Sequence, residues 1–460
     1  MNTFDLNTLP RGGRVHFIGI GGISMSGLAE ILLGRGYKIT GSDMKESPIT
    51  QKLRTLGAEI YIGQKAENIH PCDLIVYTAA IKEDNEEYIA AVRSGIKLID
   101  RAALLGAVMR AYKHAVAIAG THGKTSTTSM MTHIMLAAGA DPTVSLGGEL
   151  PAIDGNIRVG KSDSFVCEAC EYHGSFLKFF PFVSVILNIE EDHLDYFRDI
   201  EHIKETFRGF AELVPEDGAV VADIDGENVR AALCGIKKNV ITCSYDSENA
   251  DYHAADISYN SRGEGSFTLF EKGKPLGTIT LSVPGKHNVS NAVCAAAAAR
   301  FLGIPFDAVK RGLLSYGGVH RRFEYKGERN GVTVIDDYAH HPTEIEATLK
   351  TAANMKGGTV WCVFQPHTYT RTKKLFGDFV RVLGESGAKV IMLDIFAARE
   401  KDTGLVSSKE LSDATPGSRY MPGFRECADF LRQNAKSGDI VITMGAGDVY
   451  KVGEMFLDKK

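Results

Sequence analysis

The sequence predicts an α/β protein built from three domains. Its 460 residues exceed one ordinary domain of about 100–200 residues, and 44% of them are apolar, which is enough for several cores. Short apolar runs, each followed by a glycine-rich or polar segment and a helical pattern, recur along the chain. This alternation indicates parallel sheets covered by helices. We expect domains at residues 1–107, 108–317 and 318–460.

The first segment opens with an apolar strand and a glycine cluster. The strand is expected at Arg14–Ile18, and a helical pattern extends from Ser24 to Arg35. Further strands are expected at Tyr37–Thr40, Leu74–Tyr77 and Lys97–Ile99. This order is typical of a Rossmann-like domain.

Gly19, Gly21 and Gly22 connect the first strand to the first helix. They match the G-x-G-x-x-G pattern only if Ser24 replaces the last glycine, and Asp43 lies near the spacing of a ribose contact. The cluster favours a nucleotide diphosphate at a helix N-terminus more than it favours NAD. The alternative is a glycine turn that only packs the helix on the sheet.

The second segment carries the most informative motif, which is the sequence Gly120-Thr121-His122-Gly123-Lys124-Thr125-Ser126. An apolar strand at 115–119 precedes it and a helical run at 126–138 follows, as in phosphate-binding loops. Backbone N–H groups can bind phosphate oxygens, Lys124 can reach the terminal phosphates, and the Thr125 hydroxyl can bind Mg²⁺. The glycine spacing is shorter than in the general motif. We predict a P-loop ATPase-like domain that binds a nucleoside triphosphate.

Two candidate metal ligands follow strands of the same segment. Glu168 comes after the apolar run 164–166, and His193 comes shortly after the strand 183–187. A carboxylate and the Thr125 hydroxyl suit Mg²⁺, whereas one imidazole is an unusual ligand. A surface carboxylate and a structural histidine are the alternatives.

The third segment repeats the α/β alternation and predicts a second Rossmann-like domain. Its strands are expected at Val332–Ile335, Val360–Phe364, Val390–Leu393 and Ile440–Thr443, and its helices at Pro342–Asn354 and Lys373–Leu383.

Charged side chains lie near the ends of these strands. Arg322 can offset the charge on a transferring phosphoryl group, and Asp337 follows a strand at a binding edge. His340 and His341 are adjacent and point to different sides of the backbone, which disfavours a shared zinc ion.

His367 and Arg371 follow the strand 360–364 and suit a carboxylate. A polar loop without a ligand is the alternative. The eight cysteines are scattered, and only Cys167 and Cys170 form a CxxC pair, so buried thiols are favoured over a redox or zinc site.

Composition excludes several classes of protein. The net charge of −5 offers no electrostatic footprint for nucleic acid or an anionic membrane. The first ten residues lack a signal-peptide pattern, and no apolar run approaches a membrane span. We expect a cytoplasmic protein that is a monomer or weak homodimer.

These motifs together resemble the muramyl ligase family, which builds the peptide of bacterial peptidoglycan. The resemblance covers essentially the whole chain in order. The matching segments are 16–22, 25–29, the phosphate loop, 188–193, 285–288 with Asn291, the region of Arg322, 337–344 and 365–367.

The resemblance implies an ATP- and Mg²⁺-dependent ligase. The first domain would bind the UDP of the substrate, the central domain ATP and Mg²⁺, and the third would close over both and help bind the amino acid. The implied reaction joins L-alanine to the lactyl carboxylate of UDP-N-acetylmuramate through an acyl phosphate and releases ADP and phosphate.

The resemblance also implies roles for individual residues. ATP contacts are expected at Gly120, Thr121, His122, Gly123, Lys124, Thr125, Ser126, Asn288, Asn291, Arg322 and Asp337. UDP-substrate contacts are expected at Gly19, Gly21, Gly22, Ser42 and Asp43, and amino-acid contacts at His341, His367 and Arg371. The expected metal ligands are Thr125, Glu168 and His193, and the candidate catalytic residues are Lys124, Arg322, His193 and His340.

The chain departs from the family pattern at two positions. Cys170 stands where relatives often have aspartate, and Thr368 stands where some have arginine. Three other functions are alternatives: a recycling ligase that takes a ready-made peptide, an NAD-dependent oxidoreductase, and a non-catalytic nucleotide sensor. The oxidoreductase hypothesis leaves Lys124 and Thr125 unexplained, and the sensor needs no metal ligands.

Overall fold

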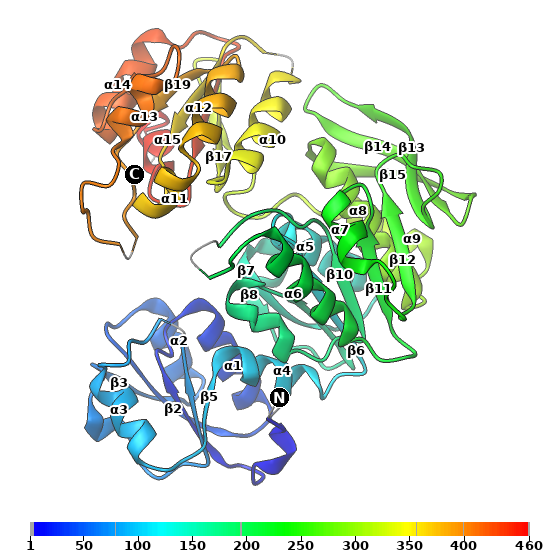
Figure 1. Cartoon of the computed structure of the whole chain (residues 1–460), viewed down its shortest axis with the longest axis vertical. Coiled ribbons are helices and arrows are strands. Elements are labelled where there is room, and N and C mark those ends of the chain that lie inside the picture. The colour runs from blue at the N-terminus through cyan, green and yellow to red at the C-terminus, as the bar shows by residue number, and fades with distance from the viewer. Residues whose placement is uncertain (1–3, 79, 194–195, 356, 399, 459–460) are drawn as a thin grey trace. The chain divides into compact units, whose positions relative to one another are not determined.

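The computed structural model describes residues 4–78, 80–193, 196–355, 357–398 and 400–458. These residues form three sheets distributed over two compact units (Figure 1). The first unit extends to Ala255 and includes Thr268–Thr278 and Ser290–Ser315. The second unit contains Asp256–Phe267, Ile279–Val289 and the chain from Tyr316 onward.

The first sheet is parallel and has the strand order β3-β2-β1-β4-β5. Its strands are β1 (Arg14–Ile18), β2 (Lys38–Asp43), β3 (Glu59–Ile62), β4 (Leu74–Tyr77) and β5 (Leu98–Asp100). Its helices are α1 (Ile23–Gly34), α2 (Pro48–Thr55), α3 (Glu86–Arg93) and α4 (Arg101–Met109), with the 3-10 helices η1 (Leu6–Thr8) and η2 (Ala66–Asn68). The strand order reverses between β1 and β4, and α/β sheets bind ligands at such a point.

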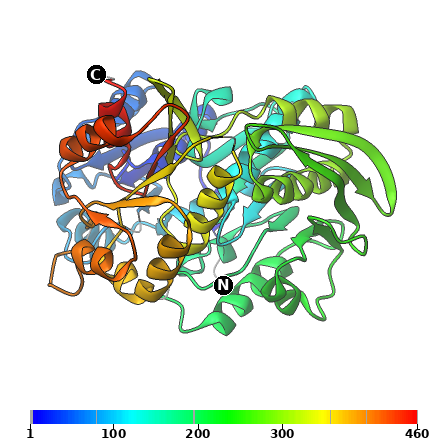
Figure 2. The ribbon, with the colours of Figure 1, turned by 90° about the horizontal axis from the view of Figure 1, so that it is seen from above.

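The second sheet has the order β15-β14-β13-β12-β11-β10-β6-β9-β7-β8. Its strands are β6 (His114–Ala119), β7 (Thr143–Leu150), β8 (Gly155–Arg158), β9 (Ser164–Glu168), β10 (Val183–Ile186), β11 (Ala219–Asp223), β12 (Val240–Ser244), β13 (Tyr252–Tyr259), β14 (Glu264–Glu271) and β15 (Lys274–Pro284). Strand β6 pairs in parallel with β9 on one side and β10 on the other, so the segments after these strands meet at one edge. The long strands β13, β14 and β15, light green in Figure 2, form one end of the sheet, and the strand order places β8 at the other.

Helices connect these strands and lead out of the sheet. They are α5 (Lys124–Ala137), α6 (Ile200–Glu212), α7 (Glu227–Leu233), α8 (Lys286–Phe301) and α9 (Phe306–Ser315), together with the 3-10 helices η3 (Pro151–Ile153) and η4 (Tyr172–Lys178).

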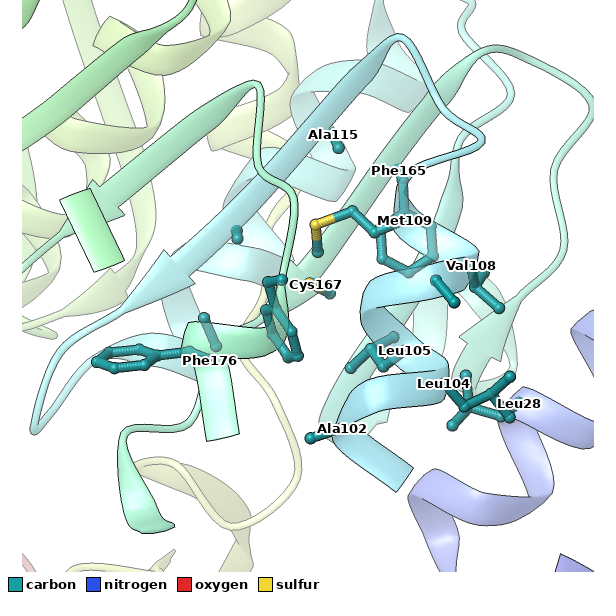
Figure 3. Packing of buried hydrophobic residues seen from close by; sticks show 14 of the residues in the cluster. Leu28, Ala102, Leu104, Leu105, Val108, Met109, Ala115, Phe165, Cys167 and Phe176 are labelled. Atoms are coloured by element: carbon teal, nitrogen blue, oxygen red, sulfur yellow. The ribbon is translucent and has the colours of Figure 1, made fainter. Parts of the chain in front are cut away.

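One apolar core joins the first two sheets within the first unit. Helix α4 contributes Leu104, Leu105 and Met109, which pack with Leu28 of α1 and Phe165 of β9 (Figure 3). At Gly106 in the same helix, an added Cβ atom would lie 1.9 Å from the carbonyl oxygen of Lys178. Helix α4 therefore approaches the backbone at the end of η4 so closely that only glycine fits there.

The third sheet has the order β16-β17-β21-β18-β19-β20. Its strands are β16 (Glu324–Arg329), β17 (Val332–Asp337), β18 (Val360–Phe364), β19 (Lys389–Met392), β20 (Arg419–Tyr420) and β21 (Ile440–Met444). Its helices are α10 (Pro342–Ala353), α11 (Tyr369–Lys374), α12 (Phe376–Glu385), α13 (Ser408–Ala414), α14 (Phe424–Asn434) and α15 (Tyr450–Phe456). Strands β17, β21 and β18 are mutually parallel, so their carboxyl ends lie at one edge.

The α/β class and the main strands predicted from the sequence are confirmed, including the strands Leu74–Tyr77 and Val360–Phe364 with the same bounds. The single helix predicted at Lys373–Leu383 is wrong, because the structure divides this region into α11 and α12. Leu375 separates the two helices with φ −99° and ψ 19°. The domain boundaries at 107/108 and 317/318 stay a prediction.

Candidate active site

The phosphate loop, residues 120–126, connects β6 to α5 and includes the first turn of that helix. Gly123 has a φ of 83°, which is left-handed. A Cβ atom at this position would lie 2.7 Å from Oδ1 of Asn291, so glycine is required for both conformation and space. Asn291, predicted to contact ATP, is therefore packed against the loop that would bind its phosphates.

Asn188, just after β10, holds the phosphate loop in shape. Its carbonyl oxygen accepts the N–H of Thr121 at 3.1 Å, and its Oδ1 accepts the N–H of His122 at 2.7 Å. Its Nδ2 donates to the carbonyl of His122 at 3.1 Å. The N–H of Glu190 donates to the Thr121 hydroxyl at 2.9 Å. The sequence singled out this strand end, but it did not predict that Asn188 organises the loop.

The Lys124 side chain folds back onto the phosphate loop and bonds to its carbonyl groups. Its Nζ donates to the carbonyls of Gly120 and Thr121, and lies 3.2 Å and 3.0 Å from the two carboxylate oxygens of Glu171. Burial lowers the pKa of this ammonium, but the neighbouring acidic groups, Glu171 foremost, together outweigh that effect, and the pKa is raised overall. Lys124 is thus held positively charged at the loop.

Glu171 is a second residue of this site that the sequence-based assignment missed. Only 2% of it is exposed, and its Oε1 lies 3.9 Å from Nε2 of His193. It brings the loop lysine and the predicted metal ligand His193 together around one carboxylate. The available signal was a second glutamate three residues after Glu168, just beyond the end of β9.

Glu168 lies at the end of β9, and its Oε1 accepts the N–H of Gly147 on β7 at 2.6 Å. This carboxylate therefore ties β7 to the edge of the sheet that carries the phosphate loop. Thr125, the other predicted oxygen ligand, lies in the first turn of α5 and is half-buried.

The imidazole of His193 is held by an aromatic neighbour. The ring of Tyr172 lies 4.5 Å from it between centroids, with an interplanar angle of 31°. The backbone of His193 is left-handed with φ 52°, and that of His173, next to Tyr172, is left-handed with φ 55°. Such strained conformations of non-glycine residues concentrate at functional sites.

The two thiols of the CxxC pair differ in exposure, since Cys167 is buried and Cys170 is half-buried. Burial raises the pKa of Cys167 and of Cys170. Burial therefore favours the protonated form of both thiols.

The first sheet carries its own glycine turn at the end of β1. The N–H groups of Gly19 and Ile20 donate to the carbonyl of Ser42, each at 2.9 Å, and the N–H of Gly21 donates to Oδ2 of Asp43 at 2.8 Å. Ser42 and Asp43 hold the turn from the end of β2. The Asp43 carboxylate thus bonds to an N–H that the sequence assigned to a phosphate, while its ribose contact stays a prediction.

Arg322 lies in a strained turn of the second unit. The residues on either side, Arg321 and Phe323, are left-handed with φ 60° and 49°. Nη1 of Arg322 is 3.5 Å from Oε1 of Glu344, and its guanidinium lies 5.3 Å from the centroid of the Tyr338 ring. The left-handed backbone at Arg321 and Phe323 therefore fixes the position from which the Arg322 side chain extends.

Arg321 anchors this turn to the edge of the third sheet. Its Nε donates to Oδ2 of Asp336 at 2.9 Å, and its Nη2 donates to the carbonyl of Gly445 at 2.6 Å. Its carbonyl accepts the N–H of Tyr338 at 2.6 Å. The ends of β17 and β21 are therefore joined through one guanidinium.

Asp337 is buried at the end of β17 and accepts three hydrogen bonds. The donors are the N–H of Phe323 at 3.1 Å, the N–H of Ala339 at 2.7 Å and the hydroxyl of Thr348 at 3.1 Å. Burial raises its pKa to about 6, with Arg322 opposing the shift. The structure gives Asp337 a role in shaping the loop, and its predicted ribose contact is a separate hypothesis.

The adjacent histidines have different environments. Nδ1 of His340 lies 3.0 Å from the carbonyl of Tyr338, which can only accept, so Nδ1 carries the proton and Nε2 has a lone pair. Burial lowers the pKa of His340. His341 is the N-cap of α10, where its Nδ1 accepts the N–H of Thr343 at 3.4 Å. His340 is thus a neutral proton acceptor, whereas His341 caps a helix.

His367 and Arg371 come together after β18, as predicted. Nη1 of Arg371 lies 3.2 Å from Nδ1 of His367, and the rings of His340 and His367 are 5.6 Å apart between centroids. A guanidinium only donates, so Nδ1 of His367 accepts and its Nε2 carries the proton. These donors can meet a small carboxylate.

We expect the imidazole of His367 to titrate at pH of about 4. Its pKa is lowered to about 4, first by burial and then by the positive charges of protonated His340 and of Arg371. The ring should then stay neutral from pH 5 upward. NMR titration of the ring carbon, assigned with His367→Gln, measures this; a midpoint near 6.5 would contradict the geometry.

The predicted site residues fall into two sets, one in each unit. The first unit holds the glycine turn, residues 120–126, Glu168, His193 and Asn291. The second holds Asn288, whose Nδ2 donates to the carbonyl of Pro284 at 2.7 Å, together with Arg322, Asp337, His340, His341, His367 and Arg371.

Comparison with known proteins was consistent across the chain. The family models matched are the Mur ligase family catalytic domain at residues 14–113, the Mur ligase middle domain at 118–299 and the Mur ligase glutamate ligase domain at 321–447. No helix within the described ranges is both long and apolar enough to cross a membrane.

Two curated relatives match nearly the full length. The UDP-N-acetylmuramate–L-alanine ligase of Acetivibrio thermocellus is 53% identical over 450 residues, which is 97% of this chain and 96% of the relative. The enzyme of the same name from Clostridium perfringens is 50% identical over 96% of this chain and 97% of its own.

A solved structure agrees with the fold. The UDP-N-acetylmuramate–alanine ligase of Thermotoga maritima superposes with a TM-score of 0.80 at 27% identity, covering 97% of this chain and 99% of that one. The predicted three-domain α/β architecture is confirmed. With three family models in order and relatives half identical over almost the whole length, this chain belongs to the Mur ligase family.

Proposed function

We propose that this protein is an ATP-dependent ligase that joins L-alanine to the lactyl carboxylate of UDP-N-acetylmuramate. The observation that carries the proposal is 53% identity over 97% of the chain to an enzyme of that name, combined with an intact phosphate loop. The reaction passes through an acyl phosphate and releases ADP and phosphate. Its place is the cytoplasmic synthesis of peptidoglycan precursors, in a monomer or weak homodimer.

The chemistry requires two anions to approach each other. The muramate carboxylate attacks the γ-phosphate of ATP, so positive groups must offset the combined charge. Lys124, held charged by Glu171, supplies one such group at the phosphate loop. Arg322 supplies another where charge develops on the transferred phosphoryl group.

The donor set at the phosphate loop suits Mg²⁺. Glu171 is a buried carboxylate facing Lys124, and Thr125 adds a hydroxyl in the first turn of α5. Hard oxygen donors of this kind, shared with substrate phosphates, are what Mg²⁺ prefers. Thr125, Glu171 and His193 would hold the ion, with Glu168 beside them. Bound there, Mg²⁺ supplies charge neutralisation for the phosphates.

Glu171→Gln is expected to lower kcat about 10²-fold or more and to raise the Mg²⁺ concentration needed for half-maximal phosphate release. The substitution keeps the shape but removes the buried charge that faces Lys124. Glu168→Gln is the matched comparison, because that side chain already bonds to Gly147. A larger shift in Mg²⁺ dependence for Glu168→Gln would reverse the assignment of the two carboxylates.

The second half-reaction needs an amine acceptor site. L-Alanine's neutral amine attacks the acyl carbon, and phosphate leaves. His367 and Arg371 would bind the alanine carboxylate through Nε2–H and the guanidinium. His340 is a better candidate base than His193, because the Nε2 of His340 carries a lone pair and its lowered pKa keeps the ring neutral.

Each of the three domains would bind a different substrate. Residues 1–107 would bind the UDP substrate, 108–317 ATP and Mg²⁺, and 318–460 the amino acid. The glycine turn at Gly19, Gly21 and Gly22 would contribute to the UDP site.

The deciding experiment is phosphate release with ATP, Mg²⁺ and UDP-N-acetylmuramate against a panel of amino acids and peptides. We expect release with L-alanine, and the same panel gives the relative rates for glycine and serine. Release with a ready-made peptide but not with L-alanine would identify the recycling ligase instead. Binding of nicotinamide cofactor without phosphate release would support the oxidoreductase hypothesis.

A further inference from the structure

A buried polar stripe lies beneath helix α3 on one face of the first sheet. His16 on β1 pairs in register with Thr40 on β2, and Ser42 follows two residues later on the same face. Their exposed fractions are 2%, 5% and 0%. Ile18, on the same face, packs with Ile75 and the α3 residue Ala91.

Glu87 of α3 points into this stripe and is fully buried. Its Oε1 lies 2.9 Å from Nε2 of His16, and its Oε2 accepts the Ser42 hydroxyl at 2.5 Å. Nδ1 of His16 lies 2.8 Å from the Thr40 hydroxyl. In this network, Nε2–H of His16 donates to Glu87, and the Thr40 hydroxyl donates to Nδ1 of His16. Every polar group of the network then has a hydrogen-bond partner.

The network ends on the residue that shapes the glycine turn. The side chain of Ser42 is fixed by Glu87, and its carbonyl accepts the N–H groups of Gly19 and Ile20, each at 2.9 Å. Strand β1 and strand β4 flank the point where the sheet order reverses, and α3 follows β4. Glu87 thus joins the segment after β4 to the turn after β1, the two walls of a ligand crevice in such a sheet.

We propose that Glu87 is a positioning residue for UDP-substrate binding, acting through Ser42 on the glycine turn. Packing does not require it, because apolar residues of similar volume stabilise a core at least as well as buried charged groups. Directional hydrogen bonds instead fix one arrangement of the strand end relative to the helix. This inference rests on the proposed function, since it assigns the crevice to the UDP substrate.

The test compares Glu87→Ala, Glu87→Gln and Ser42→Ala with the control Glu86→Ala, which alters the exposed glutamate next in the chain. Calorimetry measures the Kd of UDP-N-acetylmuramate, and steady-state kinetics measure kcat and the KM of each substrate. We expect Glu87→Ala to raise the UDP-substrate Kd and KM about tenfold or more, because buried polar partners lose their bonds. The KM of ATP and of L-alanine and the kcat at saturation should change less than about twofold.

Glu87→Gln separates positioning from charge. Its Oε1 can still accept from Ser42, and its NH₂ can donate to Nε2 once the His16 proton moves to Nδ1, so substrate affinity should be largely restored. Ser42→Ala removes one hydroxyl and carries the same test if Glu87→Ala does not fold. An unchanged UDP-substrate Kd in folded Glu87→Ala or Ser42→Ala, or an equal change in all kinetic parameters, overturns the proposal. Failure of the wild-type protein to bind UDP-N-acetylmuramate overturns the proposed function along with it.

Discussion

Lys124→Ala is expected to abolish ATP-dependent ligation, with a loss of about 10³-fold or more in kcat, while UDP-N-acetylmuramate still binds. The ammonium is the group of the phosphate loop that meets the terminal phosphates in the proposed reaction, and electrostatic groups of this kind are commonly the largest contributors to phosphoryl transfer. Its charge is secured by Glu171 at 3.0 Å. Phosphate release and calorimetric binding of the UDP substrate measure the two halves of the prediction separately.

The variant also leaves Glu171 without its cation. Glu171 is 2% exposed, and removing one partner of a buried pair commonly costs about 3–5 kcal/mol of stability. Lys124→Ala combined with Glu171→Gln removes this unpaired charge, so it should regain stability without regaining activity. Lys237→Ala, at an exposed lysine of the same unit, is the control for a simple loss of charge. Turnover near the wild-type rate in Lys124→Ala would contradict the role proposed for Lys124.

The strand–loop–helix around Lys124 was predictable because local rules all agree there. An apolar strand, a left-handed glycine at Gly123 and a helix start at Lys124 each leave a pattern in the sequence. The contact between Glu171 and Lys124 was not predictable in this way. Glu168 ends β9 and Glu171 follows three residues later, and only the folded backbone shows that Glu171 meets Lys124 while Glu168 bonds to Gly147.

Polar residues near strand ends have two roles, binding ligands and bonding to backbone N–H groups, and the sequence does not distinguish between them. Asp43 and His341 were both expected to contact substrates. The structure has Asp43 accepting the N–H of Gly21 and His341 capping α10. The same residue types that bind ligands also satisfy backbone N–H groups at turns and helix starts. Only the three-dimensional arrangement shows which groups are already bonded within the protein.

Arg322→Ala is expected to lower kcat about 10³-fold with little change in the KM of L-alanine. The proposed partner of its guanidinium is negative charge that develops as the phosphoryl group moves, and such an interaction raises kcat rather than ground-state affinity. The strained backbone at Arg321 and Phe323, and the bond from Arg321 to Asp336, fix where Arg322 is presented. Pre-steady-state measurement of acyl-phosphate formation isolates the affected step.

Two further variants separate geometry from charge at this position. Arg322→Lys keeps the positive charge but loses the planar guanidinium with its two parallel donors, so it should retain only part of the wild-type kcat. Its stability cost should be small, about 1 kcal/mol or less, because the contact with Glu344 is long at 3.5 Å and partly exposed. Arg381→Ala, at an exposed arginine of α12, controls for the loss of any cation from the same unit. If Arg322→Ala raised only the KM of L-alanine, this guanidinium would bind the amino acid instead. A lower kcat, found whether ATP or L-alanine is the varied substrate, assigns it to phosphoryl transfer.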